Sequence, residues 1–176
     1  MALKSTVFKA EINVADMNRD VYGDYSLTLA RHPSETTERM MLRLLAFACH
    51  ASENLEFGRG LSTEEEPDLW QRDLTGEIEL WVDLGTPDPE RIRKACGRSR
   101  QVVVYCYGHR AVPVWWAKHE TRLARFENLR IFVLEPGGLA DLAQPSMRMQ
   151  CSIEGQDIWI NSGDNAAQLT WEVLKA

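Results

Sequence analysis

The feature that most constrains the fold is an unbroken apolar run from Val102 to Tyr107. Consecutive β-favouring residues with no polar residue among them are typical of a strand that is covered on both faces. The run therefore predicts a sheet with other elements packed against each side of it.

The segment before this run predicts a strand and then a helix. From Glu77 to Leu84, apolar residues alternate with Glu79, Trp81 and Asp83. Alternation places Glu79 and Asp83 together on the face opposite the core-facing residues. Asp88 followed by Pro89 is typical of a helix start, and Gly97 predicts the helix end.

The rest of the chain predicts a mixed α/β (α+β) protein. The strongest helix pattern follows Ser34, which we expect to be the N-cap, and runs to about Ser52. Helix, three strands, helix and strand then follow one another over residues 34–107. The other predicted elements are an N-terminal hairpin (4–14 and 20–30), strands at 55–61, 69–74 and 129–134, a helix near 113–120, and two or three strands ending at Val173.

Size and composition predict one soluble domain over residues 1–176. The chain has 44% apolar and 26% charged residues, and no apolar run approaches the roughly 18 residues that span a membrane. We expect no membrane contact and a cytoplasmic location, since the N-terminus lacks the pattern of a secretory signal. The net charge of −6 argues against long-range attraction to nucleic acid.

Two acids predict a divalent-cation site. Asp68 and Asp83 flank a turn near Gly76, so antiparallel pairing of their strands would bring them side by side. Carboxylate oxygens are the ligands that hard divalent cations prefer. Lys94, on the helix that follows, carries an ammonium that could stabilise the charge of a reacting phosphate.

Several longer runs resemble the YaeQ family, a divergent bacterial branch of the PD-(D/E)XK nuclease superfamily. They are the N-terminal Met-Ala-Leu-Lys and the segments at 27–35, 38–46 and 91–96. The resemblance implies a restriction-endonuclease-like core over about residues 34–107, a mixed sheet flanked by helices. The N-terminal hairpin and the C-terminal strands would extend or cover this sheet.

The resemblance also implies roles for named residues. In the superfamily the first acid follows a proline, as Asp68 follows Pro67, and the second begins an acid-x-Lys triplet. Here Asp83 is followed by Leu84 and Gly85, so lysine is missing from the triplet. The resemblance implies that Lys94 substitutes for it and that the catalytic residues are Asp68, Asp83 and Lys94.

The implied cofactor is Mg²⁺ or Mn²⁺, bound by Glu38, Asp68 and Asp83. Glu38 resembles the first-helix glutamate that binds metal in many superfamily members. Glu35, one turn earlier, competes with it for this role, and Glu79 is a further possible ligand. A bound cation of this kind lowers the pKa of a water that attacks phosphorus.

Two functions follow as alternatives. The first is a metal-dependent phosphodiesterase that acts on nucleic acid. The second is a non-catalytic protein that retains the nuclease-like fold and binds another protein, which Gly85 and the negative net charge favour. In the second case Asp68 and Asp83 only end their strands, and Lys94 is solvated.

Overall fold

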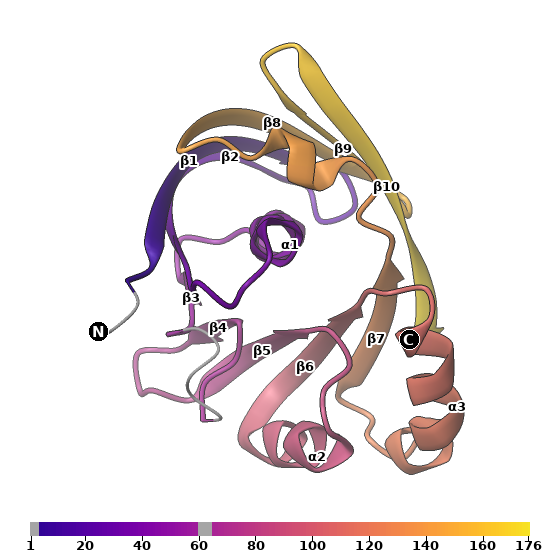
Figure 1. The fold of residues 1–176 in the computed structure, drawn as a ribbon. Helices are drawn as coiled ribbons and strands as arrows, with labels where there is room; N and C mark the ends of the chain where they lie inside the picture. The colour runs from indigo at the N-terminus through magenta and orange to yellow at the C-terminus, as the bar shows by residue number, and fades with distance from the viewer. Residues whose placement is uncertain (1–3, 60–64) are drawn as a thin grey trace. The chain divides into compact units, whose positions relative to one another are not determined.

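The computed structural model describes residues 4–59 and 65–176, which form a mixed α+β fold (Figure 1). The chain divides into two compact units. Unit 1 comprises residues 1–53 and 136–170, and unit 2 comprises residues 54–135 and 171–176. The expectation of a single domain over 1–176 stays a prediction, and the predicted core at 34–107 is shared between the two units.

The sheet of unit 1 has the strand order β2-β1-β8-β9-β10. β1 and β2 pair antiparallel over their full lengths, β1 and β8 pair parallel, and β8, β9 and β10 form an antiparallel meander. The predicted N-terminal hairpin and C-terminal strands are confirmed. The bounds are β1 Thr6–Asp16, β2 Val21–Arg31, β8 Ser146–Glu154, β9 Asp157–Ser162 and β10 Asn165–Lys175.

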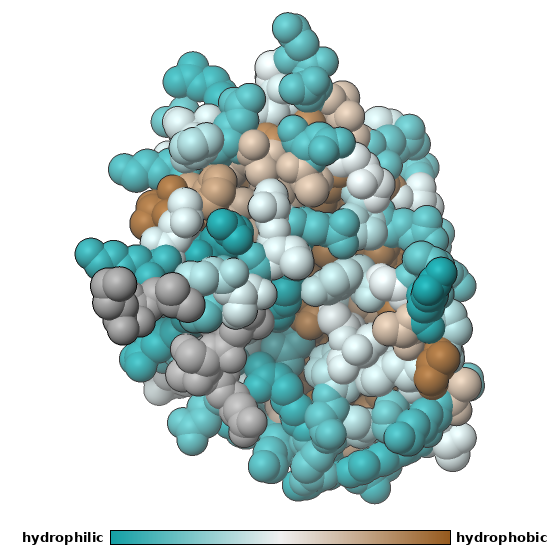
Figure 2. Space-filling model, in the orientation of Figure 1, coloured by the Kyte–Doolittle hydropathy of each residue, from teal (hydrophilic) through white to brown (hydrophobic). Residues whose placement is uncertain are grey.

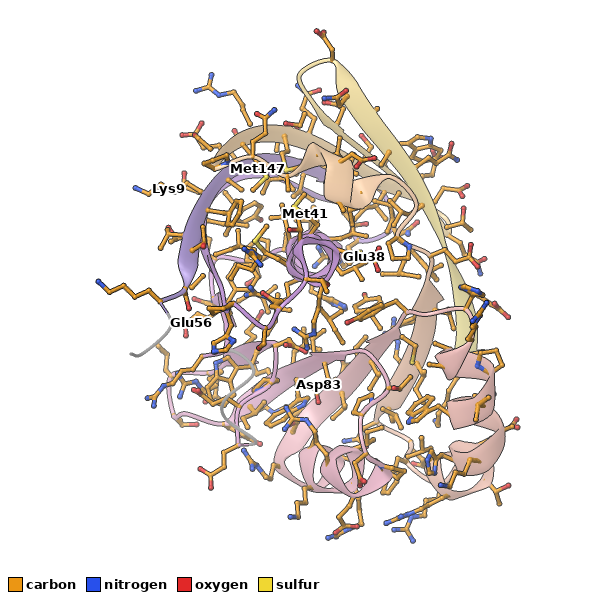
Figure 3. All side chains as sticks on the ribbon, in the orientation of Figure 1. Lys9, Glu38, Met41, Glu56, Asp83 and Met147 are labelled. Carbon is orange, nitrogen blue, oxygen red and sulfur yellow. The ribbon has the colours of Figure 1, made fainter. Side chains whose placement is uncertain are left out.

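Alternating residues of this sheet form the core of unit 1. Ala10, Ile12 and Val14 of β1 are buried, while the residues between them are exposed or only partly buried. β8 shows the same alternation, as expected for a sheet with one apolar face. Met41 of helix α1 and Met147 of β8, both labelled in Figure 3, are buried members of this core.

Helix α1 (Thr37–Cys49) is buried around its whole circumference from Met40 to Ala48. The sequence predicted an apolar stripe along one side of this helix, whereas the structure buries all its sides, including Arg43, whose charge is paired with Glu35. The predicted N-cap, Ser34, is wrong. Thr36 caps the helix by accepting a hydrogen bond from the N–H of Arg39 at 3.1 Å, whereas the Ser34 hydroxyl lies 2.6 Å from Nδ1 of His32.

The sheet of unit 2 has the order β10-β7-β6-β5-β4-β3. β5, β6 and β7 are parallel, and β3 and β4 continue the sheet antiparallel from β5. Only the last residues of β10 pair here, from Trp171 to Lys175 along β7. The bounds are β3 Leu55–Phe57, β4 Leu69–Arg72, β5 Ile78–Leu84, β6 Ser99–Cys106 and β7 Leu129–Leu134.

Helices α2 (Pro89–Arg98) and α3 (Ala111–Leu123) connect the parallel strands and pack on the same face of the sheet of unit 2. Asp88 caps α2 by accepting a hydrogen bond from the N–H of Glu90, and Pro89 is its first residue, as predicted. Ile92 of α2 and Trp115 of α3 share one buried cluster with Val102 and Val104 of β6. The continuous burial of β6 from Val102 to Cys106 confirms a strand covered on both faces.

Two strand predictions need correction. The alternation in β5 predicted one buried face, but Trp81, Val82, Asp83 and Leu84 are all buried, because α2 covers the face that carries Trp81 and Asp83. The strand expected over 55–61 ends at Phe57, and its last two residues lie outside the described residues. No helix among residues 4–59 and 65–176 is long and apolar enough to span a membrane.

Candidate functional site

Asp68 and Asp83 come together at the ends of adjacent strands of unit 2. β4 and β5 pair antiparallel, with Leu69 opposite Val82 as the last step of the register, so Asp68 directly precedes β4 where Asp83 lies near the end of β5. Both side chains are buried, and we call these two residues the acid pair.

Arg91 of α2 binds Asp83 through two hydrogen bonds. Its Nε donates to Oδ2 at 2.9 Å and its NH2 donates to Oδ1 at 3.1 Å. The indole N–H of Trp81 donates to the same Oδ2 at 3.0 Å. Two-point pairing of this kind fixes both the charge and the orientation of a carboxylate. Asp83, only 4% exposed, is therefore neutralised by a guanidinium group that is 27% exposed.

Backbone contacts hold Asp68 in place. The N–H of Leu84 donates to Oδ2 of Asp68 at 2.8 Å, and the N–H of Gly58 donates to the carbonyl of Asp68 at 2.9 Å. A Cβ at position 58 would lie 1.9 Å from the carbonyl oxygen of Pro67, so only glycine fits there. The Pro67–Asp68 segment is thus fixed against the end of β3 and against β5.

A cleft of about 510 Å³ lies beside helix α2. Its lining combines the indole of Trp81 with acidic and basic side chains. The lining residues are Glu65, Trp81, Asp88, Glu90, Arg91, Lys94, Ala95 and Arg98, and we call this the α2 cleft. The guanidinium carbons of Arg91 and Arg98 lie 5.5 and 5.1 Å from the ring centre of Trp81, within cation–π range.

Lys94 is exposed and lines this cleft, but Arg91 is the basic residue that contacts Asp83. The two residues lie three positions apart on α2, so they share one side of the helix. The proposed catalytic role of Lys94 stays a prediction.

Gly85 has a backbone conformation that explains the missing lysine. Its φ angle is +101°, in the region that residues with a Cβ rarely adopt, and its N–H donates to the carbonyl of Tyr105 at 2.9 Å. A lysine at position 85 would strain this turn out of β5. The backbone therefore opposes an acid-x-Lys triplet here.

Glu79 lies on β5, four residues before Asp83, and its carboxylate contacts residues other than the acid pair. Its carboxylate accepts a hydrogen bond from Nε2 of Gln71 at 2.7 Å and lies 3.8 Å from NH1 of Arg100. Trp81 lies between Glu79 and Asp83 on the same face of the strand. Its role as a further metal ligand stays a prediction.

The two acids predicted from the first helix belong to unit 1. Glu35 precedes α1 and is buried, with Arg43 donating from Nε and NH2 at 2.9 and 2.7 Å and Arg39 donating from NH1 at 2.9 Å. Glu38 is half-buried in the first turn of α1 (Figure 3). The prediction that Glu38, or Glu35, joins the acid pair as a metal ligand stays a prediction.

Within the described ranges, 4–59 and 65–176, no group of three His, Cys, Asp or Glu side chains is arranged to hold a metal ion. The sequence predicted Lys94, and not Arg91, as the basic residue near Asp83. The helical spacing of Arg91 from Lys94 is a signal that either residue could reach Asp83, but the sequence alone does not choose between them.

The comparisons with known proteins give one consistent result. The family model described as YaeQ protein matches residues 1–171. A curated relative from Salmonella typhi, described as an uncharacterized protein YaeQ, is 46% identical over 96% of this chain and 95% of its own length. Its counterpart from Escherichia coli K12 is 45% identical over 94% of this chain and 93% of its own length.

Two solved structures are also similar. The crystal structure of YaeQ protein from Xanthomonas axonopodis pv. citri has a TM-score of 0.95 and 48% identity, with 98% of this chain and 99% of that chain covered. The crystal structure of YaeQ protein from Pseudomonas syringae has a TM-score of 0.91 and 31% identity, with 98% and 97% covered.

Proposed function

The chain belongs to the YaeQ family, and from that premise we propose that it is a divalent-metal-dependent phosphodiesterase of the PD-(D/E)XK type that acts on nucleic acid. One observation carries the proposal: Asp68, directly before β4, and Asp83, near the end of the neighbouring strand β5, are both buried. Beside this strand pair lies the α2 cleft, which Arg91, Lys94 and Arg98 line.

The element order supports a restriction-endonuclease-like core. The chain runs α1, β3, β4, β5, α2, β6, which is the α-β-β-β-α-β order expected of that core. In this core the acid pair would sit at the ends of the second and third strands. The resemblance that predicted Asp68 and Asp83 as one site therefore agrees with their register.

The donor chemistry of the acid pair fits Mg²⁺ or Mn²⁺ in part. Two carboxylates supply oxygen ligands of the kind that these ions prefer. Both oxygens of Asp83, however, already accept hydrogen bonds from Arg91. A cation bound by Asp68 and Asp83 must therefore replace this guanidinium group.

A bound cation of this kind supplies a water of lowered pKa and neutralises charge on phosphate. The chain's own residues then have separate tasks. Lys94 and Arg98 bind phosphate oxygens in the α2 cleft, and Arg91, once it leaves Asp83, becomes a third cation for the same anion. Trp81 keeps Asp83 oriented through its indole N–H.

The test is metal binding by calorimetry together with cleavage of a panel of labelled DNA and RNA substrates. We expect Mg²⁺ or Mn²⁺ binding in the wild type, its loss in Asp83→Asn and Asp68→Asn, and tighter binding in Arg91→Gln. Asp73→Asn, which changes an acid outside the acid pair, should bind metal as the wild type does. Absence of binding at millimolar metal in both the wild type and Arg91→Gln would refute the proposal.

One observation favours the second candidate function, a non-catalytic protein-binding role. The two hydrogen bonds from Arg91 and the third from Trp81 complete the interactions of Asp83 without any cation. In that case the Asp83–Arg91 pair only attaches α2 to β5. Arg91→Gln would then lower stability to the same extent with and without Mg²⁺.

A further inference from the structure

The charge of the chain is unevenly distributed. Residues 84–130 contain ten Lys and Arg residues and four Asp and Glu residues, a net charge of +6, within a chain whose net charge is −6. The remaining residues therefore carry −12. A local excess of this size creates a field that attracts anions to one region although the whole protein repels them.

On α2 the basic residues occupy the solvent-facing side. Ile92 and Ala95 are buried against the sheet, whereas Arg93, Lys94 and Arg98 are exposed. Figure 2 shows hydrophilic side chains along the edge of the molecule where Figure 1 places α2. Gly97 lies among these residues, and a Cβ added to it would meet no atom within 4 Å.

On α3 and just beyond its end, three basic residues share one side. Lys118, Arg122 and Arg125 are separated by four and three positions, which places them along one face. All three are exposed, while the opposite side of the helix buries Val112 and Leu123. This face therefore presents a row of cations to solvent.

Glu90 connects the two helices. Arg93, on its own helix, donates to it from Nε at 2.9 Å, and Arg122 of α3 donates to it from NH2 at 2.8 Å. The hydrogen bond from Arg93 lowers the pKa of Glu90 to about 2, so the carboxylate stays ionised. One negative charge is thus shared by two guanidinium groups, and the junction keeps an excess positive charge.

We propose that the face formed by Arg93, Lys94, Arg98, Lys118, Arg122 and Arg125, the α2–α3 surface, binds the phosphate backbone of nucleic acid. Exposed cations arranged along a surface match a regularly charged polyanion, and backbone neutralisation supplies most of the non-specific affinity for nucleic acid. The −12 of the remaining residues disfavours binding elsewhere.

This inference rests on the proposed function and extends it. Lys94 and Arg98 belong both to the α2–α3 surface and to the α2 cleft, whose lining includes Arg91, the partner of Asp83. A strand bound along the surface therefore reaches the cleft beside the acid pair. The surface supplies the backbone contacts that position a phosphodiester there.

The experiment measures binding to a fluorescein-labelled DNA duplex and to the matching single strand by anisotropy, in EDTA and over a range of salt concentrations. Two variants test the surface, each with a matched control. Lys118→Glu is compared with Lys9→Glu, which makes the same charge change at an exposed position of β1 in unit 1. Gly97→Glu is compared with Gly97→Gln, which adds a similar side chain without charge.

We expect Lys118→Glu and Gly97→Glu each to weaken binding about tenfold at low salt. Each phosphate contact that is lost should make the slope of log K against log salt shallower by about 0.9 for duplex DNA. Lys9→Glu and Gly97→Gln should change affinity less than about twofold, since they leave the charge of the α2–α3 surface unaltered.

Equal weakening by Lys118→Glu and Lys9→Glu, or no binding to either DNA at low salt, would overturn the inference. The α2–α3 surface is tested separately from the proposed function because EDTA removes any metal-dependent step. Binding in EDTA that is sensitive to Lys118→Glu, without cleavage in Mg²⁺ or Mn²⁺, supports the surface and contradicts the phosphodiesterase. Metal binding at the acid pair without DNA binding supports the metal site and contradicts the surface.

Discussion

Arg91 donates hydrogen bonds to Asp83 from both Nε and NH2, and the same NH2 donates to the backbone carbonyl of Glu66 at 2.9 Å. One guanidinium group thus joins helix α2, strand β5 and the segment leading to Asp68. Whether Asp83 is a metal ligand or a structural anchor depends on how easily this contact opens.

Arg91→Ala should lower the free energy of unfolding by about 2–3 kcal/mol, because it leaves the buried Asp83 carboxylate without its positively charged partner. If the acid pair binds metal, Mg²⁺ should restore part of this loss and raise the Tm of the variant more than that of the wild type. Thermal unfolding with and without Mg²⁺ measures both effects. Arg93→Ala, at an exposed site on the same helix, is the control, and an equal Mg²⁺ response in all three proteins contradicts the metal site.

Gly58→Ala should destabilise the protein by about 2–4 kcal/mol, since the new Cβ would lie 1.9 Å from the carbonyl oxygen of Pro67. Relief of this contact requires the backbone at Pro67 to move, and that movement would also displace Asp68. Gly97→Ala is the matched control. It adds the same methyl group in open space within a helix and should stabilise by about 0.5–1 kcal/mol. Denaturant unfolding measures the change in stability of each variant. Equal stability of Gly58→Ala and Gly97→Ala would show that the Pro67–Asp68 segment moves freely.

Gly85→Lys, which completes the acid-x-Lys triplet, should lower stability and should not increase activity in the cleavage assay. The φ of +101° makes any residue with a Cβ costly at this position, by about 1–2 kcal/mol. Gly85→Ala should lose the same stability, which shows that the backbone, and not the charge, causes the loss. A Gly85→Lys variant that is as stable as the wild type and more active in the cleavage assay would contradict this explanation.

Glu90 should remain ionised well below the pH at which an ordinary glutamate is protonated. Its pKa is lowered to about 2 by the hydrogen bond from Arg93, so its contribution to stability is complete above the unfolded value of 4.5 and is lost as the pH falls toward 2. Carboxyl ¹³C shifts measured against pH report the midpoint. In Arg93→Gln the midpoint should rise toward 4.5, and an unchanged midpoint would show that Arg93 is not the cause.

Glu35 and Glu38 should respond differently to loss of charge. Glu35→Gln breaks the pairing with the buried Arg43 and should cost about 3 kcal/mol. Glu38→Gln, in the first turn of α1, should cost less than about 0.5 kcal/mol. If Glu38 is the third metal ligand, its substitution weakens Mg²⁺ binding while leaving stability almost unchanged. Calorimetry and denaturant unfolding of the two variants separate these roles.

Local signals in the sequence were sufficient for most elements. The alternation in residues 4–14 and 20–30 predicted β1 and β2, and the Asp88-Pro89 pair predicted the start of α2. These signals act between near neighbours in the chain. The antiparallel pairing of β4 with β5 also followed from local evidence, because a turn near Gly76 joins the two strands.

Choices among equivalent residues could not be made from the sequence. Arg91 and Lys94 lie three positions apart on α2 and both line the α2 cleft, and the rotation of the helix about its axis decides which one contacts Asp83. Ser34 was the predicted cap of α1, but its hydroxyl lies against His32 and Thr36 caps the helix instead. Such outcomes depend on tertiary packing rather than on residue type.

Strand β10 begins beside β9 in unit 1 and ends beside β7 in unit 2. The boundaries at 53, 135 and 170 mean that neither unit is a single continuous stretch of the polypeptide. No single truncation can therefore yield an intact unit 1 or unit 2. A fragment that stops before Trp171 leaves β7 with an unpaired edge, which can associate with other chains. Shortening this protein from its carboxyl end should therefore favour aggregation before it reveals an independent module.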